Sequence, residues 1–157
     1  MLRTTLAVLA LSASIGLAQA QAPANLDPQN TLALDTKDGR VTIRLRPDLA
    51  PKHVEQIKAL TKRGFYDGIV FHRVIDGFMA QTGDVEYGKQ SSETFNPGRA
   101  GMGGSSKPDL KAEFSAEPHV RGVCSMARTS NPDSANSQFF ICFDDARFLD
   151  KQYTVWG

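Results

Sequence analysis

The chain has 157 residues, which suits a single domain with a substantial buried core. Its 18 basic residues nearly balance 17 acidic ones, so no charge excess favours nucleic acid or an anionic membrane surface as a partner. The three histidines and two cysteines lack the spacing of metal ligands, and no motif indicates a cofactor.

The first twenty residues have the pattern of a secretory signal peptide. Arg3 is the only charged residue before a largely apolar run at 4–18, and Ala18-Gln19-Ala20 is a small-x-small cleavage site. Cleavage after Ala22 would leave a proline next, so we favour cleavage after Ala20. An uncleaved anchor is the alternative, but the run is short for a bilayer span of about 20 residues. We therefore expect export.

A flexible lead-in is expected at residues 21–30, and the folded domain at 31–157. The first element expected in this domain is a β-hairpin. The runs 31–36 and 41–46 are β-prone. Residues 37–40 join them, and the Asp-Gly pair in this stretch is a common hairpin turn.

One amphipathic helix is predicted after this hairpin. Pro51 suits the first turn of a helix. Val54, Ile57 and Leu60 then recur at a spacing of three and form one apolar face, and Gly64 ends the helix.

A second hairpin is predicted at 69–82, around Asp76-Gly77, and its register depends on the loop length. A two-residue loop would place Arg73 opposite Ala80. A three-residue loop would place Arg73 opposite Gln81 and Ile75 opposite Met79. Both lengths are common, so the pattern leaves the two registers open. Alternatively, Arg73 simply pairs with a carboxylate such as Asp76 or Asp84.

The rest of the chain is predicted to contain a long loop and three strands. Residues 85–108 are rich in Gly, Ser and Pro and indicate the loop. Strands are expected at 120–127, at 138–143 and from Tyr153 onward. Cys124 and Cys142 fall in two of these strands. Two cysteines on apolar strands are more often buried as small apolar side chains than joined in a disulfide, although an exported protein could form a disulfide.

Two segments carry the main functional signal. FHRVIDGFMAQTGD (71–84) and SMARTSNPDSANSQFFICF (125–143) are mostly apolar, yet they contain arginines and glutamines without a nucleophile or an acid–base pair. No nucleophile elbow or P-loop is present elsewhere. Chemistry at such a site must rely on placing hydrogen-bond donors beside apolar walls.

These two segments resemble the signatures of the cyclophilins, the peptidyl-prolyl cis–trans isomerases, and the resemblance covers residues 31–157. It implies a mainly β fold, a closed antiparallel eight-stranded β-barrel with capping helices. Similar proteins continue beyond Gly157 with a second helix and a closing strand, so we expect this barrel to lack both. The signal peptide and the segment KPDLKAEFS resemble exported bacterial members, which implies a periplasmic location.

The resemblance also implies roles for individual residues. Arg73 matches the family's catalytic arginine. The matched proline-pocket and substrate-contact residues are Phe78, Met79, Gln81, Ala127, Arg128, Gln138, Phe140, Phe148, Leu149 and Tyr153. Arg128 stands where the family often has Asn, Phe148 where eukaryotic members have Trp, and Tyr153 where the family has His. These changes imply weak cyclosporin binding more than lost catalysis. On pattern alone, without the resemblance, Phe78, Met79 and Phe140 are interpreted as ordinary core residues.

The implied function is rotation about X–Pro bonds in unfolded or exported polypeptides, and we expect the protein to be a monomer that needs no cofactor. An alternative is a module that captures Pro-containing peptides, as a chaperone or scaffold, without useful turnover. His72 is next to Arg73 in the sequence and is therefore expected on the opposite face of the strand. We interpret His72 as a structural residue.

Overall fold

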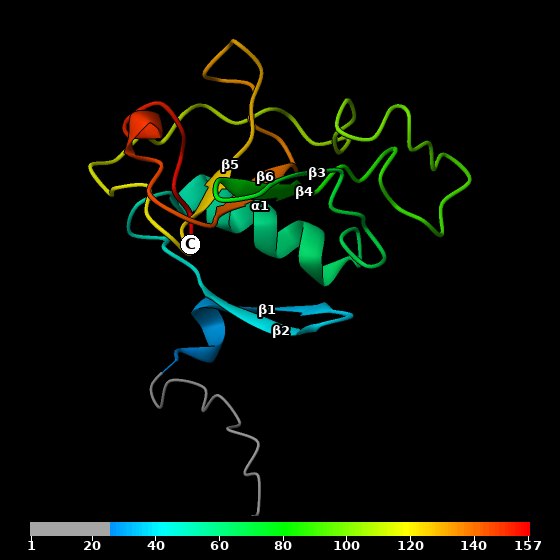
Figure 1. Cartoon of the computed structure of the whole chain (residues 1–157), viewed down its shortest axis with the longest axis horizontal. Helices are drawn as coiled ribbons and strands as arrows, with labels where there is room; N and C mark the ends of the chain where they lie inside the picture. Colours follow the sequence, from blue (N-terminus) through cyan, green and yellow to red (C-terminus); the bar gives the residue numbers. More distant parts are fainter. Residues whose placement is uncertain (1–25) are drawn as a thin grey trace, which may run out of the picture.

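The computed structural model describes residues 26–157, which form two β-sheets, one α-helix and long connecting loops (Figure 1). The predicted signal peptide and its cleavage site lie outside these residues. Within the expected lead-in, Pro28–Asn30 forms a short 3-10 helix, η1, and the Asp27 side chain caps it by accepting a bond from the Gln29 N–H at 2.9 Å. None of the helices within 26–157 is long and apolar enough to cross a bilayer.

The first hairpin consists of β1 (Thr31–Thr36) and β2 (Gly39–Arg44). Thr36 pairs with Gly39, so the loop contains only Lys37 and Asp38. The second strand therefore begins two residues earlier than predicted. A two-residue loop matches the twist of the flanking strands, which explains why the ladder continues into the Asp-Gly pair.

Helix α1 spans Pro51–Lys62, as the sequence pattern predicts. The predicted face is buried, since Val54, Ile57 and Leu60 are each at most 2% exposed. The chain leaves the helix through a Schellman motif, in which the N–H of Gly64 bonds to the Thr61 carbonyl and the N–H of Phe65 to the Leu60 carbonyl.

The second sheet has four antiparallel strands in the order β3-β4-β6-β5. Their bounds are Arg73–Ile75, Met79–Thr82, Phe139–Cys142 and Cys124–Met126. All four are shorter than predicted because flanking residues leave the ladder, as where the N–H of Val70 bonds to the Gly88 carbonyl in the long loop. The strand expected from Tyr153 is reduced to a single bridge between Ser125 and Val155.

The four-stranded sheet separates two apolar clusters. Cys124, Met126, Phe139 and Trp156 pack with helix α1 on one face, and Met79, Phe140, Cys142 and Ala146 form a smaller cluster on the other. Alternation along the strands assigns neighbouring residues to opposite clusters. The two cysteines are therefore on different faces, and both are free and buried, in line with the interpretation as small apolar residues.

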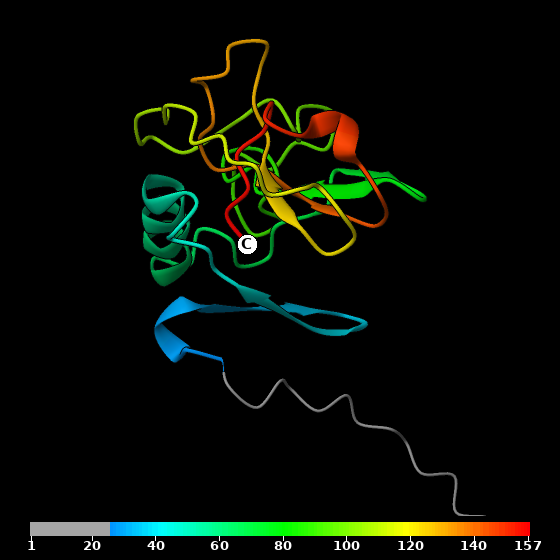
Figure 2. The same ribbon diagram turned by 90° about the vertical axis from the view of Figure 1, so that its left-hand side faces the viewer.

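Residues 26–157 do not form a closed eight-stranded barrel of the kind that the resemblance implies for the family. They contain six strands in two separate sheets, with the β1–β2 hairpin below the helix and the larger sheet (Figure 2). The last residues link the two layers, because the N–H of Arg46 bonds to the Trp156 carbonyl and the N–H of Cys124 to the Gly157 carbonyl, both at 2.8 Å. The fold described is mainly β with one helix.

Candidate functional site

The register of the second hairpin brings Arg73 opposite Gln81 and Ile75 opposite Met79. The loop therefore contains three residues, and the N–H of Phe78 closes it by bonding to the Ile75 carbonyl at 3.1 Å. Of the two registers left open by the sequence, this is the one that places a guanidinium beside an amide.

The same cross-strand row continues through the sheet and joins the two signature segments. Gln81 pairs with Phe140, and Phe140 pairs with Ser125. Residues directly opposite one another in a ladder project from the same face. Arg73, Gln81 and Phe140 thus share one face, although Phe140 is far from the other two in sequence.

A hollow of about 110 Å³ opens on this face. Its lining consists of Arg73, Phe78, Met79, Gln81, Ala127, Arg128, Phe140, Leu149 and Tyr153. All of these residues belong to the set predicted from the sequence. We call this cavity the first hollow.

Two residues of the predicted set, Gln138 and Phe148, do not line the first hollow. Phe148 lies in the short 3-10 helix η2 (Arg147–Leu149), is 65% exposed, and packs beside the Phe78 ring at a centroid distance of 5.5 Å. Gln138 lines a larger cavity next to the first hollow, and its side-chain oxygen accepts a hydrogen bond from the Gln81 amide at 2.9 Å.

The first hollow has an apolar floor and a polar rim. Met79 and Phe140 are 2% and 5% exposed. The Tyr153 ring meets Phe140 edge-on at 5.6 Å, and the Arg128 guanidinium lies over Tyr153 at 4.5 Å from the ring centroid. Arg128 also donates from Nε to the Gln152 carbonyl at 2.9 Å, so its side chain is fixed against the rim.

Arg73 does not pair with either carboxylate considered from the sequence. It is exposed, and within residues 26–157 its side chain takes part in no ion pair. Asp84 is fully buried and is occupied by backbone N–H groups instead. The guanidinium donors of Arg73 are therefore available to a bound molecule.

Asp84 organises the loop beside the site, a role that the sequence reading missed. Its carboxylate accepts bonds from the N–H groups of Glu86, Tyr87, Gly101 and Gly103 at 2.7–3.0 Å. Burial alone would raise the pKa of Asp84, but these donors outweigh it and the pKa is lowered. Asp84 is thus held in its ionised form, and its hydrogen bonds fix the position of the loop.

His72 packs against this loop and does not line the first hollow. A Cβ at Gly101 would lie 2.9 Å from its ring, which shows how closely the imidazole and the loop backbone approach. Burial lowers the pKa of His72, and the charge of Asp84 only partly offsets this effect. Both ring nitrogens of His72 are buried without a hydrogen-bond partner among the described residues, so the contacts of its ring with this loop are packing contacts.

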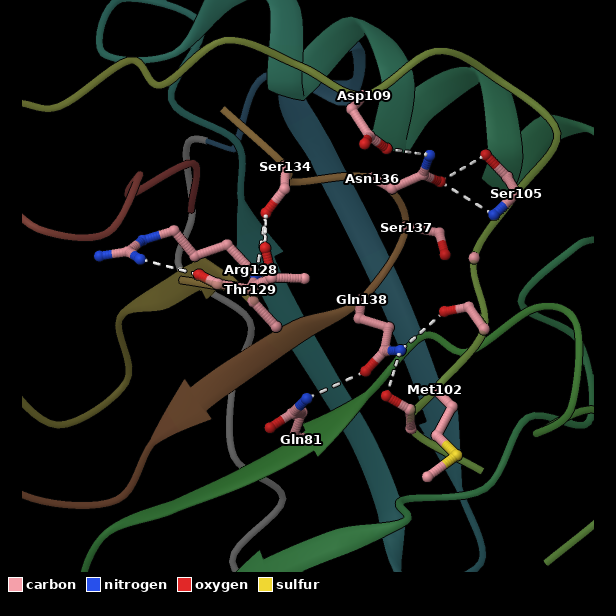
Figure 3. A pocket seen from close by; sticks show the side chains of 14 residues that line it. Gln81, Met102, Ser105, Asp109, Arg128, Thr129, Ser134, Asn136, Ser137 and Gln138 are labelled. Carbon is pink, nitrogen blue, oxygen red and sulfur yellow. Dashed lines mark hydrogen bonds between the residues drawn. The ribbon is translucent and has the colours of Figure 1, made fainter. Parts of the chain in front are cut away.

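A second hollow, of about 380 Å³, adjoins the first and shares Gln81, Ala127 and Arg128 with it (Figure 3). Asn136 shapes its far wall by accepting bonds from the Ser105 N–H at 2.9 Å and from the Ser105 hydroxyl at 2.7 Å. The sequence reading missed this cavity. The glycine cluster at 101–104 was the only local signal, since the opposite wall comes from a distant segment.

His119 supports the floor of the first hollow from behind. Its ring stacks on Phe140 at 6.3 Å. Nδ1 lies 3.0 Å from the Asp150 carboxylate and Nε2 lies 3.1 Å from the Ser125 hydroxyl. Because His119 and Ser125 are fully buried, this Ser–His–Asp arrangement is closed to substrate and serves to hold the Phe140 strand. No sequence pattern connects these residues.

The arrangement suits recognition of an apolar group with polar flanks. The first hollow combines buried aromatic and sulfur-containing walls with two guanidinium groups, of Arg73 and Arg128, and one side-chain amide, of Gln81. Residues 26–157 contain no group of three or more His, Cys, Asp or Glu side chains placed to hold a metal ion. The chemistry that these side chains themselves offer is hydrogen bonding and charge stabilisation.

Comparison with known proteins gives a consistent set of relatives. The family model described as cyclophilin type peptidyl-prolyl cis-trans isomerase/CLD matches residues 31–157. A probable peptidyl-prolyl cis-trans isomerase of Brucella suis is 59% identical over 157 residues, covering 99% of this chain and 79% of the relative. A peptidyl-prolyl cis-trans isomerase of Helicobacter pylori is 40% identical over 126 residues, covering 79% of this chain and 69% of the relative.

The solved structures that resemble this chain are also cyclophilins. A cyclophilin from Hirschia baltica is similar with a TM-score of 0.69 and 31% identity, covering 84% of this chain and 64% of that one. A cyclophilin type isomerase from Cryptosporidium parvum, crystallised in the presence of the dipeptide Ala-Pro, has a TM-score of 0.69 and 27% identity, covering 81% of this chain and 76% of that one.

Proposed function

Because the chain belongs to the cyclophilin-type peptidyl-prolyl cis–trans isomerases and is an enzyme of that class, we propose that Arg73 is its catalytic group. The observation that carries the proposal is the position of Arg73. Its guanidinium lines the first hollow, faces the same side of the sheet as Gln81, and takes part in no ion pair within residues 26–157.

The reaction explains why one free guanidinium is enough. Rotation about a peptide bond meets a barrier of about 18–20 kcal/mol that arises from amide resonance, and no covalent bond breaks. In the twisted transition state the prolyl nitrogen regains a lone pair. A donor aimed at this nitrogen binds the transition state better than either ground state, which is the condition for acceleration. Arg73 remains charged at any physiological pH and carries several such donors.

The first hollow would hold the proline ring while the chain turns. Its floor, Met79 and Phe140, is nearly inaccessible to water, and Phe78 and Leu149 complete the apolar wall. A twisted amide is less polar than a planar one, so an apolar wall favours it. Gln81 stands beside Arg73 and would bind the peptide backbone on either side of the proline.

We further propose that the substrates are X–Pro segments of exported, incompletely folded proteins. The support is the signal-peptide pattern at residues 1–20 and the Ala-Pro dipeptide named for the Cryptosporidium relative. A periplasmic location and a monomeric state belong to this proposal. Localisation of a tagged full chain in a bacterial host, by fractionation, tests the export.

We propose weak cyclosporin binding on the basis of two rim residues. Phe148 is mostly exposed and offers a smaller contact than the Trp of eukaryotic relatives, and Tyr153 is engaged by Arg128 and Phe140. We also propose that the two sheets are parts of the family's eight-stranded barrel, because residues 154–157 already bridge them.

A protease-coupled isomerisation assay on an X–Pro peptide tests the role of Arg73. We expect Arg73→Ala to lower kcat/KM by about a hundredfold or more, the scale on which removing one transition-state donor acts. Arg73→Lys keeps the charge but not the planar fork, and should recover only part of the loss. Arg63→Ala is the matched control, since Arg63 is also exposed and lies over the Phe65 ring at 5.0 Å, outside both hollows.

Circular dichroism of each variant separates lost catalysis from lost structure. A folded Arg73→Ala protein with unchanged turnover would overturn the proposed role. A folded wild-type chain that binds Pro-peptides without turnover would instead support the peptide-capture alternative.

A further inference from the structure

We propose that Gln138 is a positioning residue, which orients the side-chain amide of Gln81 and is itself oriented by the loop that contains Gly101 and Gly103. The inference rests on the proposed function, because Gln81 matters here as a group that contacts the bound peptide. It assigns Gln138 a different part from the direct substrate contact expected from the sequence.

The side-chain amide of Gln138 can adopt only one orientation. Its Nε2 donates to the Gly101 carbonyl at 2.9 Å and to the Gly103 carbonyl at 2.7 Å (Figure 3). A primary amide has two N–H donors, and both are used here. A flipped amide would face its oxygen toward two carbonyl oxygens and lose both bonds. The loop therefore decides where the Gln138 oxygen points.

This oxygen in turn decides the orientation of Gln81. Oε1 of Gln138 accepts a bond from Nε2 of Gln81 at 2.9 Å. An acceptor at this position requires the nitrogen of Gln81, not its oxygen. Gln81 then keeps its own oxygen and one N–H for the first hollow, which it lines together with Arg73. The loop thus orients Gln138, and Gln138 orients the hydrogen-bonding groups of Gln81 that the peptide would contact.

The loop that contains Gly101 and Gly103 is itself held in place by hydrogen bonds, so it can fix the orientation of Gln138. The peptide N–H groups of Gly101 and Gly103 donate to the buried Asp84 carboxylate at 2.7 and 2.9 Å, while their carbonyls accept from Gln138. The packing is close, because a Cβ at Gly103 would lie 2.6 Å from the Asp84 carboxylate. Both polar ends of the two glycines are therefore held by buried or half-buried side chains.

A consequence is that Gln138 has no free N–H left to offer a substrate. Its Oε1 can accept one further bond, but that atom already faces Gln81. The resemblance to the cyclophilins implied direct substrate contact by both Gln81 and Gln138. In the structure the two glutamines have different parts: Gln81 faces the first hollow, and Gln138 acts by orienting Gln81.

Proton exchange of the side-chain amides tests the arrangement in the wild-type protein, without reference to activity. We expect the Gln138 NH₂ protons to exchange with solvent much more slowly than those of exposed Gln29, whose side chain makes no hydrogen bond within residues 26–157. A nitrogen-edited NMR spectrum with solvent-exchange transfer measures both. Equal, fast exchange of the two residues would overturn the proposal.

A double-mutant cycle tests the action through Gln81. Gln138→Glu removes both donors to the loop, and we expect kcat/KM to fall about fivefold to tenfold, the scale of one lost hydrogen bond. In a Gln81→Leu background, the same Gln138→Glu change should cause no further loss, because the residue through which it acts is gone. Losses that multiply would instead show that Gln138 contacts the peptide directly, and would overturn the proposal.

Two controls keep the outcomes separate. Gln29→Glu makes the same chemical change on the exposed surface and should leave kcat/KM unchanged. If Gln138→Glu fails to fold, Gln138→Met supplies the cycle with a side chain of similar length and no donors. Failure of the Arg73 proposal would appear as an active Arg73→Ala protein, and it would leave the exchange measurement on Gln138 unaffected.

Discussion

At the scale of single residues, two glycines near the ends of β4 both have a positive φ but have different surroundings. Gly77 has a φ of 67° and Gly83 a φ of 91°. A Cβ at Gly77 would meet nothing within 4 Å. A Cβ at Gly83 would lie 2.5 Å from the Ser137 carbonyl oxygen and 3.0 Å from the Cα of Gln138. The close contact between β4 and the Gln138 segment therefore requires glycine at 83.

This difference gives a matched pair of variants. Gly77→Ala should cost about 1–2 kcal/mol of unfolding free energy, the strain of a left-handed residue with a side chain. Gly83→Ala carries the same strain and, in addition, about 1–3 kcal/mol from overpacking. Urea unfolding followed by circular dichroism measures both. Equal losses would show that the contact at Gly83 relaxes without cost.

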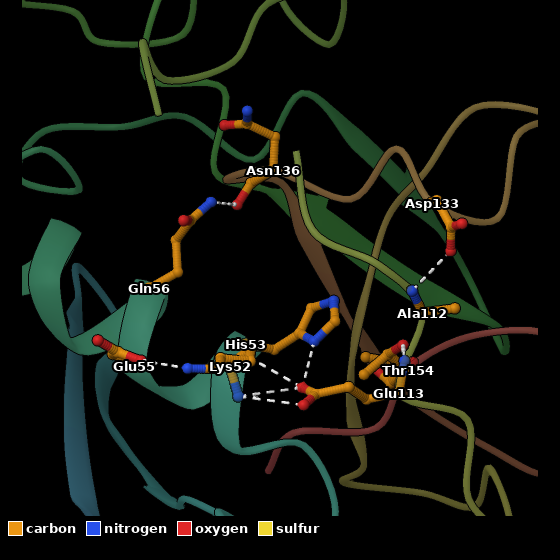
Figure 4. Close-up of polar contacts among 10 residues, drawn as sticks. Lys52, His53, Glu55, Gln56, Ala112, Glu113, Asp133, Asn136 and Thr154 are labelled. Carbon is orange, nitrogen blue, oxygen red and sulfur yellow. Dashed lines mark hydrogen bonds and ion pairs between the residues drawn. The ribbon is translucent and has the colours of Figure 1, made fainter. Parts of the chain in front are cut away.

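At the scale of elements, helix α1 is capped by a residue far away in sequence. Ala50 at the N-cap position has no side chain to accept a bond. Instead the Glu113 carboxylate accepts from the N–H groups of Lys52 and His53 at 3.1–3.2 Å and lies 2.6 Å from Nδ1 of His53 (Figure 4). A carboxylate at a helix N-terminus is also favoured by the helix dipole.

Removing the charge at this cap should weaken the helix. We expect Glu113→Gln to lower the free energy of unfolding by about 1–2 kcal/mol, the usual range for a lost cap. Glu55→Gln on the exposed side of the same helix is the control. Its 3.6 Å ion pair with Lys52 is exposed and should contribute little. Equal effects of the two substitutions in thermal unfolding would contradict the capping role.

The capping contribution should also depend on pH. Burial alone would raise the pKa of Glu113, but the bonds from His53 and Lys52 outweigh it and lower the pKa below 4.5. A lowered folded-state pKa adds stability above the unfolded pKa, and this stability is lost as pH falls through the folded value. The difference between wild type and Glu113→Gln should therefore be largest near neutral pH and shrink below pH 4.5. A difference that stays constant down to pH 3 would argue against it.

At the scale of the whole molecule, Trp156 joins the two sheets. It is fully buried, its ring meets Phe139 edge-on at 5.2 Å, and its backbone bonds to both Arg46 and Cys124. Its indole N–H is buried without a partner among the described residues. Trp156 thus contributes packing but leaves one polar group unsatisfied.

Replacing Trp156 with two different residues separates these effects. Trp156→Ala should cost about 3–5 kcal/mol because it opens a large cavity between the layers. Trp156→Phe keeps most of the volume and removes the unpaired N–H, so it should cost less than about 1.5 kcal/mol. Far-UV circular dichroism measures the stability of both variants, since Trp156 is the only tryptophan in the chain. A Phe variant as unstable as the Ala variant would show that the indole shape itself is required.

Local patterns were sufficient for the elements whose signals lie close together in the sequence. The i, i+3 spacing of Val54, Ile57 and Leu60, with Pro51 before it and Gly64 after it, predicted helix α1 correctly. The first strand was also correct, the second was predicted two residues too late, and the later strands were predicted too long. A strand ends where its partner ends, and the partner is not visible in the local sequence.

The sequence by itself determined the family, the helix, and all the residues that line the first hollow, because the two signature segments contain most of them. Only the tertiary structure decided the register that places Arg73 beside Gln81, the absence of an ion pair at Arg73 among the described residues, and the separation of Cys124 from Cys142. It alone revealed the second hollow and the role of Asp84. The physical reason is that hydrogen bonds and close contacts between distant segments depend on the path of the whole backbone, which no local spacing encodes.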